Sequence, residues 1–252
     1  MENGDRIDEI IYPILKDVWG YSDFRPMQRE IIHQIMLNRD LLAILPTGGG
    51  KSICFQVPAL AKRGICIVVS PLIALIKDQV QNLKKLNIKA LSVHSGMSYR
   101  EVDIALDNAI YGNYKFLYLS PERLNTQLFR ARVSRMDVSM IVVDEAHCIS
   151  QWGYDFRPDY LTISQIKSEV ARNRRDVDSE FIPHDVPIIA LTATATEKVA
   201  DDICDRLSFA SKNIIRSGFD RPNLSYLVKQ TENKLGNLLA LCNKINGSAI
   251  IY

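Results

Sequence analysis

The stretch LLAILPTGGGKS, residues 41–52, decides the fold expected for this chain. Its first five residues are apolar without alternation, which is typical of a strand buried on both faces of a sheet. Glycines that turn backbone N–H groups toward phosphate oxygens come next, ahead of a predicted helix. Lys51 could reach the β- and γ-phosphates and the Ser52 hydroxyl could bind Mg²⁺. The stretch predicts a phosphate-binding loop that comprises Pro46, Thr47, Gly48, Gly49, Gly50, Lys51 and Ser52. The alternative is a glycine-rich turn.

Further apolar runs repeat the pattern of the first one along the chain, at residues 65–69, 116–119, 140–143 and 188–191. Helical periodicity fills stretches between them, at residues 72–86, 98–111, 160–172 and 197–207. Strands that alternate with helices predict an α/β fold, with a mainly parallel sheet and helices on both faces. A polar or small-residue cluster follows each run. Because parallel strands end at one edge, we expect a single functional edge there.

An acidic pair follows the most apolar of these strands. Asp144 could hold Mg²⁺ near the phosphate loop, and Glu145 could orient and activate an attacking water molecule. His147 could sense the γ-phosphate or link the pair to the next motif. Alone, such a pair is often only a polar strand end, but together with the Lys51 loop it predicts a site for phosphoryl transfer.

An aromatic segment comes directly after the acidic pair. Trp152, Tyr154 and Phe156 alternate in a polar stretch that contains a glycine, and Gln151 and Arg157 flank them. Flat rings could stack on unpaired bases, and arginine could contact phosphate. A structural cap on the sheet is an equally good interpretation of the residues by themselves.

These motifs together resemble a known family. The Pro46–Ser52 loop with Asp144-Glu145-Ala146-His147 resembles superfamily 2 helicases of the DEAH type, and residues 148–158 resemble the aromatic-rich loop of RecQ helicases. The resemblance implies a RecA-like fold and Mg-ATP hydrolysis that drives 3′ to 5′ unwinding of DNA. It also implies single-stranded and partially duplex DNA as partners. Tyr154 stands where many members have histidine, so a role that needs an imidazole does not carry over.

The segment at residues 19–28 resembles the family's adenine-recognition motif. The resemblance implies that the amide of Gln28 reads the adenine edge and that Tyr21 and Arg25 stack on the base. Chemistry alone favours a surface position for Gln28. The periodicity here predicts a helix at residues 7–18 and a second helix that begins with Pro26.

Three further strand ends resemble the family's DNA-side and coupling motifs. The alternative is that their hydroxyls and prolines only cap the helices that follow. The expected contacts are Ser70, Pro71 and Lys77 after the second strand, Ser120, Pro121 and Arg123 after the next, and Thr192 and Thr194 after the last.

The resemblance also divides the chain. We expect a first motor domain at residues 1–217, and a linker with the truncated start of a second at residues 218–252, in which residues 223–229 and 249–252 form strands and residues 232–245 a helix. The arginine finger of a complete second domain would then be missing, so the chain should bind ATP, hydrolyse it weakly and not unwind DNA. The alternatives are a stand-alone module that ATP switches, or a translocase or annealing factor.

The composition excludes little. The formal net charge of +2 neither indicates nor excludes a nucleic-acid partner, because binding needs only a local basic groove. The five cysteines form no C-x-x-C pair, so we expect neither disulfides nor zinc. Reduced cysteines suit a cytoplasmic protein, and we expect a bacterial-type, nucleoid-associated one. No apolar run reaches membrane-spanning length. The mixed charges of residues 172–187 predict an exposed loop, or a helix end that runs into a loop, with a DNA contact as the alternative.

Overall fold

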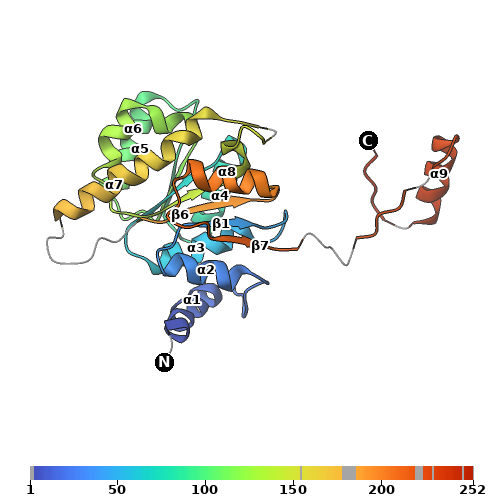
Figure 1. The fold of residues 1–252 in the computed structure, drawn as a ribbon, viewed down its shortest axis with the longest axis horizontal. Helices are drawn as coiled ribbons and strands as arrows, with labels where there is room; N and C mark the ends of the chain where they lie inside the picture. Colours follow the sequence, from blue (N-terminus) through green and yellow to red (C-terminus); the bar gives the residue numbers. More distant parts are fainter. Residues whose placement is uncertain are drawn as a thin grey trace. The chain divides into compact units, whose positions relative to one another are not determined.

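The chain divides into two units, Met1–Gly218 and Phe219–Tyr252 (Figure 1). The computed structural model describes residues 3–153, 155–177, 186–218, 224–228, 230–245 and 247–251, and only the backbone of residues 3 and 172–177. Tyr154, predicted to contact DNA, lies outside the described residues. Residues 178–185 of the charged segment predicted as a loop also lie outside the described residues.

Seven strands of the first unit form one sheet, in the order β3-β4-β2-β5-β6-β1-β7. The strands are β1 (Leu41–Ile44), β2 (Ile65–Val69), β3 (Ala90–Val93), β4 (Phe116–Leu119), β5 (Val138–Val143), β6 (Ile188–Thr192) and β7 (Ile214–Arg216). All neighbouring strands in this order pair in parallel. Five strands are buried along their whole length, which explains their uninterrupted apolar sequences. The predicted α/β fold with a parallel sheet is confirmed.

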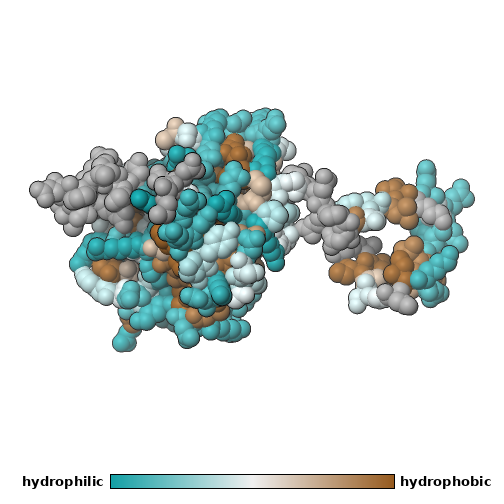
Figure 2. Space-filling view, turned by 90° about the horizontal axis from the view of Figure 1, so that it is seen from below, coloured by the Kyte–Doolittle hydropathy of each residue, from teal (hydrophilic) through white to brown (hydrophobic). Residues whose placement is uncertain are grey.

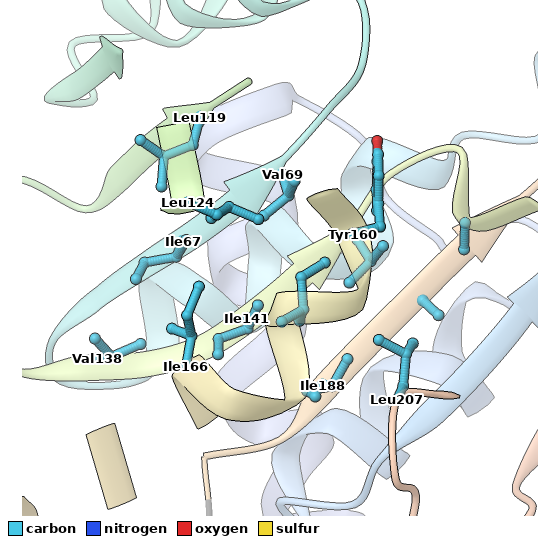
Figure 3. Packing of buried hydrophobic residues seen from close by; sticks show 14 of the residues in the cluster. Ile67, Val69, Leu119, Leu124, Val138, Ile141, Tyr160, Ile166, Ile188 and Leu207 are labelled. Carbon is cyan, nitrogen blue, oxygen red and sulfur yellow. The ribbon is translucent and has the colours of Figure 1, made fainter. Parts of the chain in front are cut away.

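Helices cover both faces of this sheet, as predicted. One face packs against α2 (Gln28–Met36), α3 (Lys51–Ala61) and α4 (Ile73–Lys85). The other face packs against α5 (Tyr99–Tyr111), α6 (Gln127–Val133), α7 (Ile163–Val177) and α8 (Glu197–Arg206). Figure 3 shows this second cluster, in which Ile166 of α7 lies among the strand residues Ile67, Ile141 and Ile188. The helix α1 (Asn3–Trp19) packs outside α2 and α3.

Local sequence explains where several helices begin. Ser98 caps α5 through a capping box with Glu101, and Thr126 and Thr196 cap α6 and α8 by accepting backbone N–H groups. Three 3₁₀ helices complete the connections: η1 (Pro121–Asn125), η2 (Ala146–Ile149) and η3 (Pro158–Thr162).

The second helix begins later than the sequence predicted. Pro26 lies in a turn, and α2 begins at Gln28 after Met27, whose φ of 69° is left-handed. The Gln28 side chain accepts the backbone N–H of Arg25, which closes this turn and moves the helix start. The prediction that Pro26 opens the helix was therefore wrong.

Two strands and one helix were not predicted. The strands β3 and β7 lie at the sheet edges and are only partly buried, so their sequences lack a long apolar run. The helix α6 has only seven residues, too few for a clear period. The helix α7 continues past residue 172 to Val177, so the charged segment begins as a helix end, one of the two structures that its sequence predicted.

The second unit contains the helix α9 (Lys234–Lys244), close to its predicted bounds. Residues 224–228 and 249–251 form no strand, so the strands predicted there were wrong. A strand needs a neighbour for its backbone hydrogen bonds, and the described part of this unit offers none. Its apolar side chains are exposed, Val228 at 95% and Ile250 at 80%. Figure 2 shows hydrophobic patches on the surface of this unit.

Among the described residues, no helix is long and apolar enough to cross a membrane.

Candidate active site at the carboxyl edge of the sheet

Five strands that are consecutive in the sheet, β4-β2-β5-β6-β1, end in the predicted motifs. Val69 pairs with Leu119 and Val143, Val143 pairs with Ala190, and Ile44 pairs with Thr192, so the five strands end within two residues of one another. The next residues keep that register, because the Asp144 N–H donates to the Val69 carbonyl over 2.8 Å. The sheet therefore brings the predicted motifs to one edge.

The predicted phosphate loop joins β1 to α3. Gly48 and Gly50 have φ angles of 78° and 76°, a left-handed conformation that other residues rarely adopt. The Gly49 N–H donates to the Pro46 carbonyl over 2.9 Å, and α3 begins at Lys51. The loop thus ends at a helix N-terminus, where free N–H groups and the helix dipole favour anions.

The predicted adenine motif is hydrogen-bonded to the backbone of this loop. Arg25 donates to the Gly48 carbonyl over 2.6 Å, and the Gln28 amide donates to the Gly50 carbonyl over 2.9 Å. Gln28 is only 3% exposed, whereas Tyr21 is 53% exposed. Reading of adenine by Gln28 stays a prediction. In this structure, both ends of its amide are bonded within the chain.

The acidic pair meets the phosphate loop across the sheet. Lys51 Nζ lies 3.4 Å from Glu145 Oε1, and Ser70 donates to Asp144 Oδ2 over 3.1 Å. Glu145 has a φ of 49°, a strained conformation for a side chain of its size. Such strain concentrates at functional sites, which supports the interpretation of this pair as part of a phosphoryl-transfer site rather than as a polar strand end.

The two carboxylates have opposite electrostatic environments. Burial and the neighbouring Glu145 raise the pKa of Asp144 above its ordinary value. Hydrogen bonding from His147, together with the charge of Lys51, lowers the pKa of Glu145 despite its partial burial. The Cys148 thiol and the Glu145 carboxylate raise the pKa of His147 to about 10. Glu145 therefore carries a full negative charge at neutral pH, next to a protonated His147.

His147 links the acidic pair to the next strand. Its Nδ1 atom lies 3.1 Å from the Thr192 hydroxyl and 3.3 Å from Glu145 Oε2. Thr192 is fully buried, whereas Thr194 is exposed, so only the second hydroxyl is open to a ligand.

Tyr160 belongs to this site and was not identified from the sequence. Its buried hydroxyl donates to the Asp144 backbone carbonyl over 3.2 Å, and Figure 3 shows the side chain extending from the cluster. A single tyrosine at the start of a predicted helix gave no signal of this contact.

The predicted DNA-side motifs divide into buried and exposed residues. Ser70 and Ser120 are 2% and 1% exposed, and Pro71 and Pro121 are also buried, so their side chains position the edge. Lys77 is exposed.

Arg123 and Arg157 are tied to backbone carbonyls close to these motifs. Arg123 donates to the His94 carbonyl, and Arg157 donates to the Pro71 carbonyl. The second contact joins the end of the aromatic segment to the motif after β2.

The predicted aromatic segment, residues 151–157, is called the aromatic loop below. Trp152 is 63% exposed, and a Cβ atom on Gly153 would lie 2.5 Å from the His147 carbonyl. The loop therefore packs its backbone tightly on η2 while its first ring faces outward. Gln151 is also exposed, and Phe156 is half-buried.

The donor set suits a hard cation better than a soft one. Asp144 and Ser52 offer carboxylate and hydroxyl oxygens, which Mg²⁺ prefers, and the raised pKa of Asp144 indicates a carboxylate that a cation would stabilise. No group of three or more His, Cys, Asp or Glu side chains that could hold a metal occurs in the described part of the chain.

The fold and this edge define a RecA-like nucleotide-binding domain. Solved structures agree: the helicase domain of Hef from Pyrococcus furiosus superimposes with a TM-score of 0.59 at 23% identity, covering 82% of this chain and 40% of that chain. The DEAD/DEAH box helicase family matches residues 25–203, so the chain belongs to that family.

Curated relatives indicate which helicases within this family the chain is similar to. The chain is 44% identical to the ATP-dependent DNA helicase RecQ of Bacillus subtilis over 88% of its length, and 39% identical to that of Pasteurella multocida over 95%. It spans about a third of each relative, 36% in both cases. The resemblance to RecQ helicases expected from the motifs is confirmed.

Proposed function

We propose that this chain is the ATP-binding motor domain of a RecQ-type DNA helicase. In a longer protein it would couple Mg-ATP hydrolysis to 3′ to 5′ unwinding. The observation that carries the proposal is the Lys51–Glu145 ion pair, which joins the phosphate loop to the acidic pair across the sheet. The relatives from Bacillus subtilis and Pasteurella multocida are both named as RecQ DNA helicases, which supports DNA as the nucleic acid. A cytoplasmic, nucleoid-associated location would follow from that substrate and remains a prediction.

The roles follow from charge and position. Lys51 would leave Glu145 for the phosphates of an incoming nucleotide, because a triphosphate offers more negative charge than one carboxylate. The released Glu145 would orient the attacking water molecule. Ser52 and Asp144 would hold Mg²⁺, which would neutralise charge on the phosphates. His147 would report the state of Glu145 to Thr192, since it contacts both.

The proposal assigns the remaining residues to binding. Tyr21, Arg25 and Gln28 would hold the base, and Gln28 would first have to release Gly50. Single-stranded DNA would cross the edge near Lys77, Thr194 and the aromatic loop. Residues 1–217 would be the first motor domain, and residues 218–252 the start of the second. An arginine finger from a complete second domain would raise the rate by about a thousandfold or more.

The test is ATP binding and hydrolysis by this chain, with and without single-stranded DNA, and Lys51→Ala as the blank. We expect a fluorescent ATP analogue to bind the wild-type chain and not the variant, with turnover near the blank in both conditions. Absence of nucleotide binding would refute the proposal. Turnover that DNA raises well above the blank would refute only the requirement for a second domain.

A further inference from the structure

One face of α8 contacts the aromatic loop at three points. Lys198, Asp202 and Arg206 are four residues apart, so they share a face of the helix. Lys198 approaches Trp152, Asp202 approaches Ser150 and Gln151 at the start of the loop, and Arg206 approaches Phe156. No motif of the sequence analysis includes these three residues.

The first contact covers a ring. Lys198 Nζ lies 3.2 Å from the centroid of the Trp152 ring, well within the range of a cation–π interaction. Trp152 is otherwise exposed. A base that stacks on this face needs the space that the ammonium group occupies, so the lysine and a base compete for the ring.

The second and third contacts hold the ends of the loop. Arg206 donates to Asp202 over 2.8 Å, and its guanidinium carbon lies 5.9 Å from the Phe156 ring centroid. Asp202 lies near the Ser150 hydroxyl and the Gln151 backbone, which together with Arg206 lower its pKa against the effect of burial. The carboxylate therefore holds Arg206 on one side and lies against the start of the loop on the other.

The same helix is connected to the acidic pair. It begins at Glu197, immediately after its cap Thr196, and the preceding strand ends at Thr192, which contacts His147. A shift of α8 would therefore act on the loop and on the acidic pair together.

We propose that Lys198, Asp202 and Arg206 are positioning residues that dock the aromatic loop on α8, and that single-stranded DNA binds by displacing Lys198 from the Trp152 ring. The inference rests on the proposed function, since it takes the loop as a DNA site. It adds the residues that hold the loop before DNA arrives.

The rival interpretation is that Lys198 binds a DNA phosphate directly. The two predict opposite signs for Lys198→Met, which keeps the aliphatic stem and removes the charge. Loss of a phosphate contact would weaken binding and reduce the salt dependence by about 0.7 in the log–log slope. If Lys198 instead only covers the Trp152 ring, its loss would tighten DNA binding by about threefold, which corresponds to the usual strength of an exposed cation–π contact, and the slope would not change.

The experiment uses the 252-residue chain with Trp19→Phe, because the sequence contains two tryptophans and this change leaves Trp152 as the reporter. Oligothymidylate is titrated at two salt concentrations while Trp152 fluorescence is followed. We expect Lys198→Met to bind about threefold more tightly, and Lys198→Arg, which keeps the cation, to match the wild type. Lys89→Met is the matched control. Lys89 also lies over a ring, 5.9 Å from the centroid of Tyr114, but it precedes the edge strand β3 and so lies at the amino end of that strand, away from the carboxyl edge of the sheet.

A second readout needs no DNA. Acrylamide should quench Trp152 more strongly in Lys198→Met and in Asp202→Asn than in the wild type, with affinity for a fluorescent ATP analogue unchanged. Equal or weaker DNA binding by Lys198→Met, or unchanged quenching in both variants, would overturn the docking inference alone. A wild-type chain that binds ATP but no oligothymidylate would overturn the DNA part of the proposed function, and this inference with it.

Discussion

Charged side chains have different surroundings at the amino ends and at the carboxyl ends of the strands of the central sheet. At the amino edge, Asp40 precedes β1, and its carboxylate accepts from Lys167 Nζ at 2.7 and 2.8 Å and from the Ile188 N–H at 2.8 Å. At the carboxyl edge, Lys51 and Glu145 are 3.4 Å apart, and burial raises the pKa of Asp144. The first edge satisfies its charges within the chain, whereas the second holds charges that a ligand would balance better.

This difference separates stability from function across one sheet. A buried ion pair with short hydrogen bonds ties β1, β6 and α7 together, so its loss should unfold the protein more easily. Strained or under-compensated groups at the other edge should lower stability and be retained for binding. Substitutions at the two edges can therefore break or sharpen the comparison.

The largest effect is expected at the amino edge. Asp40→Asn removes the counter-ion of Lys167, whose side chain is only 20% exposed. Breaking a buried pair from one side leaves an uncompensated charge, so the free energy of unfolding should fall by about 3 kcal/mol. Urea denaturation measures it, with nucleotide affinity unchanged. Asp201→Ala is the control: its pair with Lys212 is exposed, so the loss should stay below about 0.5 kcal/mol. Equal losses in both variants would contradict the buried-pair argument.

The phosphate loop provides a matched pair of glycines. Gly50→Ala would place a Cβ atom 2.3 Å from Gln28 Nε2, whereas Gly48→Ala would meet nothing within 4 Å, and both positions have a φ near 77° (78° and 76°). Left-handed strain costs both variants about 1 kcal/mol. Only the Cβ atom of Gly50→Ala also occupies the space from which the Gln28 amide would reach the base, so its nucleotide affinity should fall at least tenfold further. Titration with a fluorescent ATP analogue compares them, and equal affinities would show that the position of Gln28 does not matter for nucleotide binding.

The pH dependence of stability tests the charge on His147. Its folded pKa of about 10 lies above the ordinary value of 6.5, so its stabilising contribution is complete below pH 6.5 and is lost as the pH rises toward 10. Within that window one group can change the free energy of unfolding by up to about 1.4 kcal/mol per pH unit. We expect the wild-type chain, without nucleotide or Mg²⁺, to lose more stability between pH 7 and 9 than His147→Gln. Parallel curves would mean that Cys148 and Glu145 do not stabilise the protonated form of His147.

The fold was largely predictable from the sequence because burial on both faces leaves a direct mark on composition. The strands β1 and β5 are buried throughout and appear as apolar runs, whereas the edge strands β3 and β7 are only partly buried and were missed. The strands expected in the second unit failed for a related reason: alternation indicates a strand only where a neighbour can pair with it.

The candidate site was predictable only to the level of its motifs. The order of the sheet places Ser70 and Asp144 side by side, and the strand ends already suggested a shared edge. Contacts between a loop and a distant helix leave no such pattern, so neither Tyr160 beneath Asp144 nor Lys198 over Trp152 could be deduced. The four-residue spacing of the charges on α8 was visible, but any solvated helix face shows the same spacing.

The smallest expected effect has the opposite sign to that of Asp40→Asn, although the substitution is the same. Asp144→Asn removes a buried charge that Glu145 repels, while the amide can still accept from the Glu145 N–H and can donate to Ser70. Because the raised pKa means that the charged form destabilises the folded state at neutral pH, the free energy of unfolding should rise by about 1 kcal/mol. Urea denaturation without Mg²⁺ measures this gain, and ATP hydrolysis in the longer protein should be lost in the same variant. A stability loss comparable to that of Asp40→Asn would show that both edges use their carboxylates in the same way, and the separation of stability from function across the sheet would not hold.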